Sequence, residues 1–253
     1  MRLEYVVLSA DERSSYIDYW PIVAGAWREI VGLSPVLGYV CKDADHVPRD
    51  MADHGLVVPL PYDPKWDWVN QAQICRLWVA SQLGRSGVIL SDIDMLPLNR
   101  GYFVDSVADV PDDSLVSYSS DVLGFGIYLK RPQYPICYLA ARGSTFSEIL
   151  ELENRSWFDF CAEVRGLPYR NGADQLHFYK KARAWHGFGS RFVGLARGWE
   201  EGKANHRIDK IDWSWSVDDV RSGRYFDAHL PRPFHAWRDS IVSLCRAAGH
   251  EPE

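Results

Sequence analysis

Hydrophobic and polar positions follow two different periods along the first hundred residues. Apolar runs at 3–10, 36–41 and 56–60 have the length and composition of short β-strands. Between the first two, aromatic and aliphatic residues recur at helical spacing over 16–31, with a serine pair before them and Gly32 after them. This β–α–β order predicts a mostly parallel sheet covered by helices.

The same criteria divide the rest of the chain into further elements and a looser C-terminal part. We expect helices at 70–83, 133–165 with a break at Gly143, 171–184, and from about Ala236. Strands are expected at 87–95, where the run enters the carboxylates, and at 115–120 and 124–131. No internal repeat or low-complexity linker occurs. The prediction is therefore one α/β domain over 1–253, with a nucleotide-sugar-binding half (1–100), an acceptor-binding half (101–253) and an irregular C-terminal segment.

Length and charge narrow the possible functions. A chain of 253 residues buries enough surface to fold without disulfides or a structural metal. Its formal charge of −6 argues against binding bare nucleic acid phosphates, but not against a nucleotide whose phosphates are bridged by a metal ion. Five cysteines without a C-x-x-C pair, a strand-like N-terminus and no apolar run of about 20 residues favour a cytoplasmic protein. Peripheral contact with a membrane surface remains compatible with these features.

Aromatic residues are unusually frequent, with 11 Trp, 13 Tyr and 10 Phe. One interpretation is a core built from large rings. The other is that some rings, such as the pairs Trp66/Trp68 and Trp213/Trp215, form platforms for the faces of sugars. Composition alone does not separate these two interpretations.

The motif with the clearest chemistry is Asp92-Ile93-Asp94, directly after the apolar run 88–90. Residues i and i+2 of a strand face the same side, so both carboxylates are expected to project together. Ligands of open α/β sheets bind beyond the carboxyl ends of strands, and paired carboxylates there suit Mg²⁺ or Mn²⁺. Asp43 and Asp45 form a second D-x-D, but it lies in a polar segment that is typical of a turn.

The run RLWVASQLGRSGVILSDIDMLPLN (76–99) resembles the D-x-D region of GT-A fold glycosyltransferases. It is most similar to glycogenin, to bacterial lipopolysaccharide galactosyltransferases and to related bacterial and viral enzymes. The likeness covers 70–100 well, and the opening strand and helix and the segment 114–131 more loosely. It implies a GT-A (Rossmann-like) fold.

The resemblance also implies the donor-binding residues. Asp94 and Asp92 would hold Mn²⁺ or Mg²⁺, which bridges the diphosphate of a nucleotide sugar, with UDP favoured and GDP second. Asp92 would also touch the ribose or the donor sugar, and Arg76 would contact the donor. The segment Ser9-Ala10-Asp11 after the first strand would bind the nucleotide base.

Residues nearer the C-terminus would complete this site. His229, in His-x-x-Arg-Pro, is the expected third metal ligand, with His235 as second choice, although the segment lacks the family's interposed glycine. Arg232 would stabilise the leaving diphosphate. Asp174 would accept the proton of the acceptor hydroxyl or contact a sugar, although an Asp in the first turn of a helix also serves as a cap. Gly124 falls where the family carries an Asn-x-Gly segment, and here the Asn is missing.

The predicted activity is therefore metal-dependent transfer of a sugar from a nucleotide diphosphate sugar to a hydroxyl of a glycan or another acceptor. A D-x-D does not specify whether the anomeric centre is inverted or retained. The nearest alternative is a sugar-nucleotide nucleotidyltransferase, disfavoured because no Gly-rich basic loop follows the first strand. A non-catalytic carbohydrate-binding protein is the other alternative, motivated by the aromatic content.

Overall fold

The computed structural model describes residues 1–43, 45, 47–122, 134–167, 172–200 and 203–252. Its strands are β1 (Leu3–Asp11), β2 (Ser34–Cys41), β3 (Leu56–Pro61), β4 (Gly87–Leu90), β5 (Met95–Pro97), β6 (Leu115–Ser117), β7 (Leu139–Arg142), β8 (Phe192–Gly194), β9 (Trp199–Glu200), β10 (Lys203–Ala204), β11 (Arg207–Ile208) and β12 (Asp227–His229). Its helices are η1 (Ser15–Tyr19), α1 (Trp20–Ala26), η2 (Trp27–Val31), α2 (Met51–His54), α3 (Trp68–Ser81), α4 (Arg100–Phe103), η4 (Asp105–Val107), η5 (Ser120–Val122), α5 (Gly143–Leu150), α6 (Trp157–Arg165), α7 (Ala173–Ala184), α8 (Phe188–Arg191), α9 (Val217–Arg221) and α10 (Phe234–Ala247).

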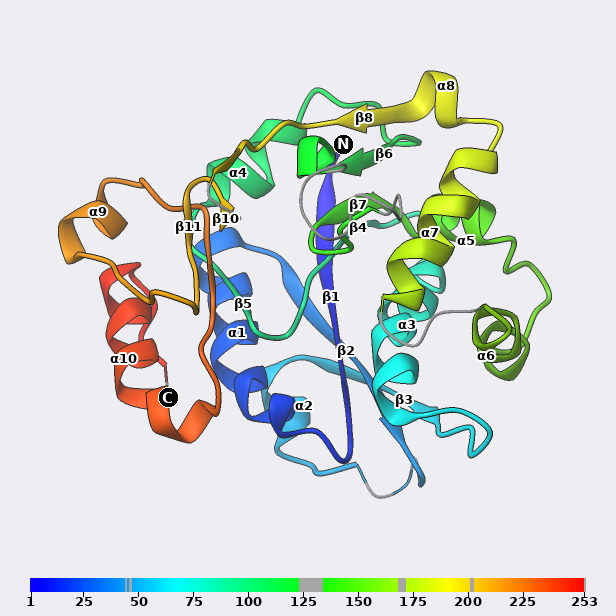
Figure 1. The fold of residues 1–253 in the computed structure, drawn as a ribbon, viewed down its shortest axis with the longest axis horizontal. Helices are drawn as coiled ribbons and strands as arrows, with labels where there is room; N and C mark the ends of the chain where they lie inside the picture. The colour runs from blue at the N-terminus through cyan, green and yellow to red at the C-terminus, as the bar shows by residue number, and fades with distance from the viewer. Residues whose placement is uncertain (44, 46, 123–133, 168–171, 201–202, 253) are drawn as a thin grey trace.

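A central sheet in the order β3-β2-β1-β4-β7-β6-β8 runs through the molecule (Figure 1). The pairs β1/β2, β2/β3, β1/β4 and β6/β8 are parallel, whereas β7 lies antiparallel to both β4 and β6. Strands from both halves of the chain share this one sheet, so the chain forms a single domain. The prediction of a mostly parallel sheet flanked by helices is confirmed.

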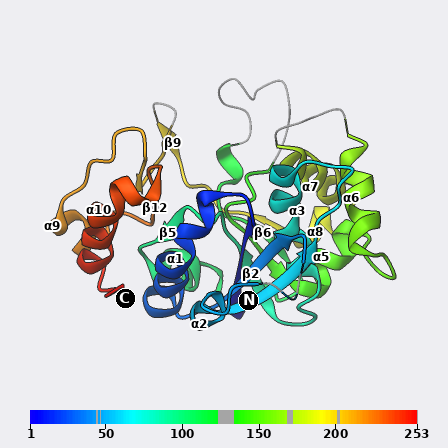
Figure 2. The same cartoon turned by 90° about the horizontal axis from the view of Figure 1, so that it is seen from below.

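Alternating side chains of β1 supply the two faces of this sheet. Val6, Leu8 and Ala10 pack into one hydrophobic cluster with α1 and α10. Val7 points the other way, into a second cluster with α3, α5, α6 and α7. Figures 1 and 2 show these two groups of helices on opposite sides of the sheet. This period of two fixes the register of the strand against both layers.

The first predicted helix is continuous through η1, α1 and η2. The Ser14 side chain accepts a hydrogen bond from the Tyr16 backbone N–H and so caps the start. Gly32 ends the run with φ +83° and donates its N–H to Trp27 O at 3.0 Å. A glycine adopts this left-handed conformation without a steric penalty, which explains the stop.

A small second sheet, in the order β11-β12-β5, joins the C-terminal segment to the residues after β4. Its antiparallel ladder pairs His229 with Met95 and Asp227 with Pro97. The sequence pattern predicted neither β5 nor β12, because strands of three residues are too short to show a period.

The expected helix over 133–165 is wrong in its first part. Residues 139–142 form β7, which pairs with β4, and Gly143 begins α5 instead of interrupting a helix. A Cβ at Gly143 would lie 2.7 Å from Ala80 O, so only glycine fits where β7 turns against α3. The predicted strand at 124–131 lies outside the described residues.

Most tryptophans belong to the core. Six are buried, at positions 20, 27, 68, 78, 157 and 185. Trp66, Trp213 and Trp215 pack against the clusters as half-buried residues. None of the described parts of the chain forms a helix long and apolar enough to cross a membrane.

Candidate active site

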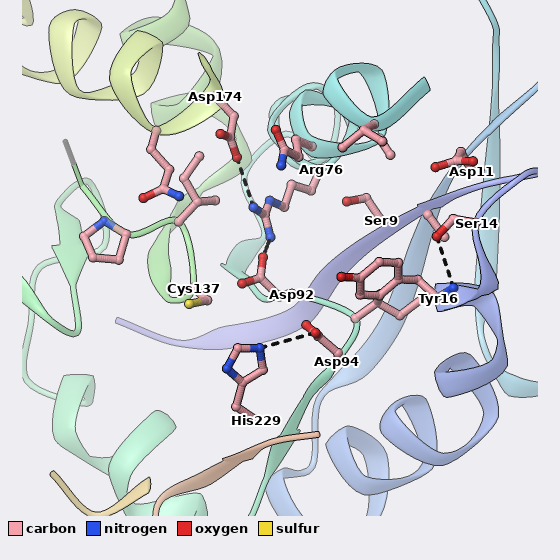
Figure 3. Close-up of a pocket in the computed structure, with 18 of the residues that line it drawn as sticks. Ser9, Asp11, Ser14, Tyr16, Arg76, Asp92, Asp94, Cys137, Asp174 and His229 are labelled. Atoms are coloured by element: carbon pink, nitrogen blue, oxygen red, sulfur yellow. Dashed lines mark hydrogen bonds and ion pairs between the residues drawn. The ribbon is translucent and has the colours of Figure 1, made fainter. Parts of the chain in front are cut away.

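A pocket of about 310 Å³ opens where β1 and β4 end, at the carboxyl edge of the parallel strands (Figure 3). Ser91 N–H donates to Val7 O at 3.0 Å, which holds the residues after β4 beside the end of β1. The lining combines residues from both halves of the chain: Ser9, Ala10, Asp11, Ser14, Tyr16, Val69, Ala72, Gln73, Arg76, Asp92, Ile93, Asp94, Pro135, Ile136, Cys137, Asp174, Gln175, Lys210, His229 and Arg232.

One wall of the pocket is a chain of three charged side chains, Asp92–Arg76–Asp174 (Figure 3). Arg76 projects from α3 and donates hydrogen bonds to both carboxylates. Its Nη1 donates to Asp92 Oδ1, and its Nη2 donates to Asp174 Oδ2 at 3.1 Å. Burial would raise the pKa of Asp92, but Arg76 outweighs it and holds that pKa below its usual value. For Asp174, burial dominates over Arg76 and raises the pKa. The two carboxylates therefore have different proton affinities around one guanidinium group.

Asp174 lies in the first turn of α7, which begins after Gly172 at φ +73°. Its side chain is 1% exposed, and Oδ1 has no hydrogen-bond partner among the described residues. A buried carboxylate oxygen without a partner retains the capacity to accept a hydrogen bond from a bound hydroxyl. The geometry thus gives Asp174 a role beyond capping its helix.

Asp94 and His229 face each other on the opposite side of the pocket. His229 Nε2 lies 3.3 Å from Asp94 Oδ2, and His229 Nδ1 lies 3.9 Å from Asp209 Oδ2. Burial lowers the pKa of His229, but the contacts with Asp209 and Asp94 outweigh burial and raise it. A histidine held between two carboxylates has a fixed ring orientation.

Two backbone contacts place His229 at this point. In the β12–β5 ladder, His229 is the partner of Met95, the residue directly after Asp94. In addition, Leu230 N–H donates to Asp94 O at 2.9 Å. The short second sheet therefore brings a residue of the C-terminal segment to the D-x-D.

One end of the pocket is formed by the end of β1 and by η1. Asp11 Oδ1 accepts a hydrogen bond from Arg13 N–H at 2.9 Å, and burial raises the pKa of this carboxyl. Arg232 donates to the Tyr16 hydroxyl, and its guanidinium carbon lies 5.0 Å from the Tyr16 ring centroid. Tyr16 and Arg232 thus form one side of the opening.

The structure brings most of the predicted site residues into this one pocket: Ser9, Ala10, Asp11, Arg76, Asp92, Asp94, Asp174, His229 and Arg232. His235 is exposed in the first turn of α10 and does not line the pocket. Gly124 lies outside the described residues. No tryptophan of the described part lines the pocket, so neither Trp66/Trp68 nor Trp213/Trp215 provides a platform there.

The local geometry of the D-x-D differs from the expectation. β4 ends at Leu90, and Met95 N–H donates to Asp92 O at 3.1 Å, so the two carboxylates lie in a turn and not in a strand. As a result, the Asp92 side chain contacts Arg76, whereas the Asp94 side chain contacts His229. Asp43 and Asp45 form the turn predicted for the second D-x-D, with Asp45 N–H donating to Asp43 Oδ1 at 3.0 Å.

Sequence reasoning missed Lys210, Tyr16 and Cys137. Lys210 Nζ lies 2.6 Å from His229 Nε2 and 3.9 Å from Asp94 Oδ2, and burial lowers its pKa against the opposing effect of Asp94. The only signal was a lysine in the apolar run IDKI, which does not connect it with the D-x-D. Tyr16 fitted the apolar face of a helix and is half-buried at the pocket.

The donor set partly fits a divalent ion. Ligand atoms of an octahedral Mg²⁺ at about 2.1 Å lie about 3 Å from each other, and the 3.3 Å between Asp94 Oδ2 and His229 Nε2 is close to that spacing. Asp209 behind the ring is the outer carboxylate typical of metal-bound histidine. However, the described residues contain no ready cluster of three His, Cys, Asp or Glu ligands, and Asp92 is bound to Arg76.

Comparisons with known proteins identify the fold. No model of a known protein family and no curated protein sequence matches the chain. Among solved structures, the glycosyltransferase GlyE of Streptococcus pneumoniae TIGR4 aligns with 100% of this chain and 66% of its own, at a TM-score of 0.55 and 12% identity. An active-site mutant of LgtC aligns over 97% of this chain and 95% of its own, at a TM-score of 0.52 and 11% identity.

A third match is a glycosyltransferase involved in the glycosylation of the major capsid of PBCV-1. It covers 95% of this chain and 99% of its own, at a TM-score of 0.51 and 10% identity. The chain therefore has the fold of GT-A glycosyltransferases, while it spans just under two thirds of the length of GlyE.

Proposed function

We propose that this protein is a glycosyltransferase that moves a sugar from a nucleotide diphosphate sugar, with UDP the favoured nucleotide, to a hydroxyl of a glycan or another acceptor. The observation that carries this proposal is the convergence on one pocket of Asp92, Asp94, His229 and Arg232 at the carboxyl edge of the sheet. Sugar transfer by the structural neighbours that share this fold is consistent with it.

The donor would lie along the pocket from Asp11 to Asp174. The end of β1, with Ser9, Ala10 and Asp11, offers backbone and side-chain groups to the base and ribose. Arg232, at the opening, provides a fixed cation for the diphosphate. Arg76 and Asp92 at the other wall offer polar contacts to the donor sugar. This order places the bond that breaks between Arg232 and the Arg76 wall.

We further propose that Mn²⁺ or Mg²⁺ binds at Asp94 and His229 during turnover, with Asp92 as a third ligand once it leaves Arg76. When bound, such an ion neutralises charge that grows on the departing diphosphate. Lys210 lies against both Asp94 and His229, so ion binding requires this side chain to move. Arg232 stabilises the same departing charge from the chain itself.

In the reaction, the bond between the anomeric carbon and the diphosphate oxygen breaks and a bond to the acceptor oxygen forms. The nucleoside diphosphate leaves with the bonding electron pair, and the acceptor hydroxyl gives up its proton. We assign that proton to Asp174 Oδ1, because Oδ2 is held by Arg76 and Oδ1 has no hydrogen-bond partner among the described residues. Its raised pKa suits a carboxylate that takes up a proton.

Ligand binding and turnover test this proposal together. Thermal shifts would be recorded for the protein with UDP, GDP and a free oligosaccharide, each with Mn²⁺ and with EDTA. Release of UDP from UDP-sugars would then be measured with a mixture of glycan acceptors. Binding of a nucleoside diphosphate and its release from a sugar donor support a transferase. A nucleotidyltransferase would instead form the nucleotide sugar from a sugar phosphate and a nucleoside triphosphate, and a carbohydrate-binding protein would bind the oligosaccharide alone.

The free thiols support a proposal for the cellular location. Cys41, Cys75, Cys161 and Cys245 are buried, Cys137 is half-buried at the pocket, and all five are free. Burial raises the pKa of Cys75 and of Cys137, which makes these thiols unreactive. We infer that the protein works in the reducing cytoplasm.

A further inference from the structure

Lys210 occupies the part of the pocket that lies between Asp94 and His229. Its Nζ atom is 2.6 Å from His229 Nε2 and 3.9 Å from Asp94 Oδ2. The side chain is 25% exposed, so the amine is in contact with the pocket and not sealed in the core. No role in the proposed reaction requires a lysine at this position.

Nζ lies close to the place that an ion would need, nearer to His229 than to Asp94. Asp94 Oδ2 and His229 Nε2 lie 3.3 Å apart, and a cation that binds both must lie beside this pair, as the amine does. A lysine ammonium is a compact point charge with three donors, so it can contact His229 and retain donors for another acceptor. The chain itself therefore places a positive charge at its expected ion site.

The remaining charges of the pocket show which anion would meet this amine. Asp92 and Asp174 are both bonded to Arg76 at the far wall. On the near side, Asp94 is the carboxylate next to Lys210, and Arg232 is a second cation in the pocket lining. A diphosphate on this side of the pocket would meet Lys210 and Arg232 as well as the carboxylate of Asp94, while Asp11 lines the pocket at the end of β1. The two cations attract the anion even without an added ion.

We propose that Lys210 binds the diphosphate of the donor and takes the place of a divalent ion at Asp94 and His229, so that the protein binds a nucleoside diphosphate in the absence of divalent metal. This role rests on the proposed nucleotide-sugar donor. Mn²⁺ and the Lys210 amine are then alternative occupants of one place, and Mn²⁺ displaces the amine when it binds.

Calorimetric titration with UDP, in EDTA and in Mn²⁺, tests the exchange on the whole protein. Wild-type protein is expected to bind UDP in EDTA. Lys210→Met should weaken that binding about tenfold, the value of one charge-assisted hydrogen bond, and Lys210→Arg should largely preserve it. Mn²⁺ should restore binding by Lys210→Met, which also shows that the variant is folded. Lys180→Met removes a lysine from the exposed side of α7 and serves as the matched control.

Titration with Mn²⁺ alone gives a second readout. Lys210→Met is expected to bind Mn²⁺ more tightly than wild type, because the competing amine is gone, and Lys180→Met is not. Equal UDP affinity of wild type and Lys210→Met in EDTA would overturn the proposal, as would a loss that Mn²⁺ does not restore. UDP binding by wild type only in Mn²⁺ would overturn it and leave the transferase function standing. Failure to bind UDP or GDP under either condition contradicts the transferase function itself.

Discussion

Arg76 and Asp174 are 98 residues apart in the chain and form an ion pair, with Nη2 3.1 Å from Oδ2 and both side chains nearly inaccessible to solvent. The pair connects α3, in the first half of the chain, with the first turn of α7, in the second. It also fixes the carboxylate to which we assign the acceptor proton. The same contact therefore contributes to stability and holds the carboxylate for which we propose a catalytic role.

Loss of Arg76 should destabilise the protein strongly. Arg76→Met leaves the buried Asp174 without its charge partner and also unpairs Asp92, whose side chain is 36% exposed. Removing one member of a buried ion pair costs about 3–5 kcal/mol. Urea denaturation measures the free energy of unfolding. Arg85→Met, at an exposed position, is the matched control and should change it by less than about 0.5 kcal/mol. Similar losses in both variants would show that the Asp92–Arg76–Asp174 chain adds no stability.

Asp94→Asn should abolish most sugar transfer without unfolding the protein. The substitution keeps the shape of the side chain and removes the charge that faces His229 and Lys210. Because the ion that we propose at this place would supply several kcal/mol of charge stabilisation, we expect turnover to fall by about 100-fold or more. The second D-x-D gives the control: Asp45→Asn lies in a surface turn and should leave turnover unchanged. A full rate with retained metal dependence in Asp94→Asn contradicts the assignment.

His177 should make the protein less stable as the pH falls below about 6.5. Burial lowers the pKa of His177 to about 4, although Glu163 opposes this effect. The unfolded chain takes up a proton near pH 6.5 while the folded protein does not, so stability present above pH 6.5 is lost as the pH falls toward 4. Between pH 7 and pH 5 the loss should be on the order of 2 kcal/mol.

The measurement compares the pH dependence of unfolding in wild type and in His177→Gln, which cannot titrate. His235→Gln replaces an exposed histidine of α10 and controls for the loss of any histidine. The free energy of unfolding should change less between pH 7 and pH 5 in His177→Gln than in wild type. In His235→Gln it should change as much as in wild type. Identical slopes in all three proteins would assign the acid sensitivity to other groups.

Asp227→Asn should destabilise the C-terminal segment that carries His229. Burial would raise the pKa of Asp227, but Arg197 and Arg207 outweigh it and hold that pKa far below its usual value. The carboxylate is fully buried and accepts hydrogen bonds from both arginines, from Arg197 Nη2 at 2.6 Å and from Arg207 Nη2 at 2.8 Å. Its neutralisation leaves two buried cations unpaired, at a cost of about 3–5 kcal/mol.

The surface pair Arg224–Asp219, at 3.0 Å, provides the comparison for Asp227. Exposed pairs contribute about 0–1 kcal/mol, so Asp219→Asn should change the free energy of unfolding little. If the free energy of unfolding falls no more in Asp227→Asn than in Asp219→Asn, the ion pairs of Asp227 with Arg197 and Arg207 do not hold β12 in place.

The elements that the sequence predicted correctly have a hydrophobic pattern that extends over many residues. The elements that it missed are defined by strands with which they pair far away in the chain. The helical spacing over 16–31 and the strand runs at 36–41 and 56–60 appear in the structure close to their expected limits. Residues 139–142 form an apolar run without alternation, and such a run does not by itself distinguish a buried strand from a buried helix. The position of β7 between β4 and β6 is set by the tertiary structure and leaves no pattern in the local sequence.

The site shows the same division. Asp92 and Asp94 follow a strand, and the end of a strand in an α/β sheet points to a ligand. Lys210 carries no local signal, since it reaches the pocket only through the pairing of β11 with β12 and of β12 with β5. The aromatic content was equally ambiguous in sequence, and burial assigns six of the tryptophans to the core.

The ladder between β5 and β12 has a consequence for synthesis of the protein. A chain is made from its N-terminus, and the strands β1 to β4 can pair before the C-terminal segment exists. His229 and Arg232 follow every other pocket-lining residue in the chain, so the pocket is completed only after synthesis has passed Arg232. A nascent chain that has not yet reached β12 thus lacks the part of the pocket that carries His229 and Arg232.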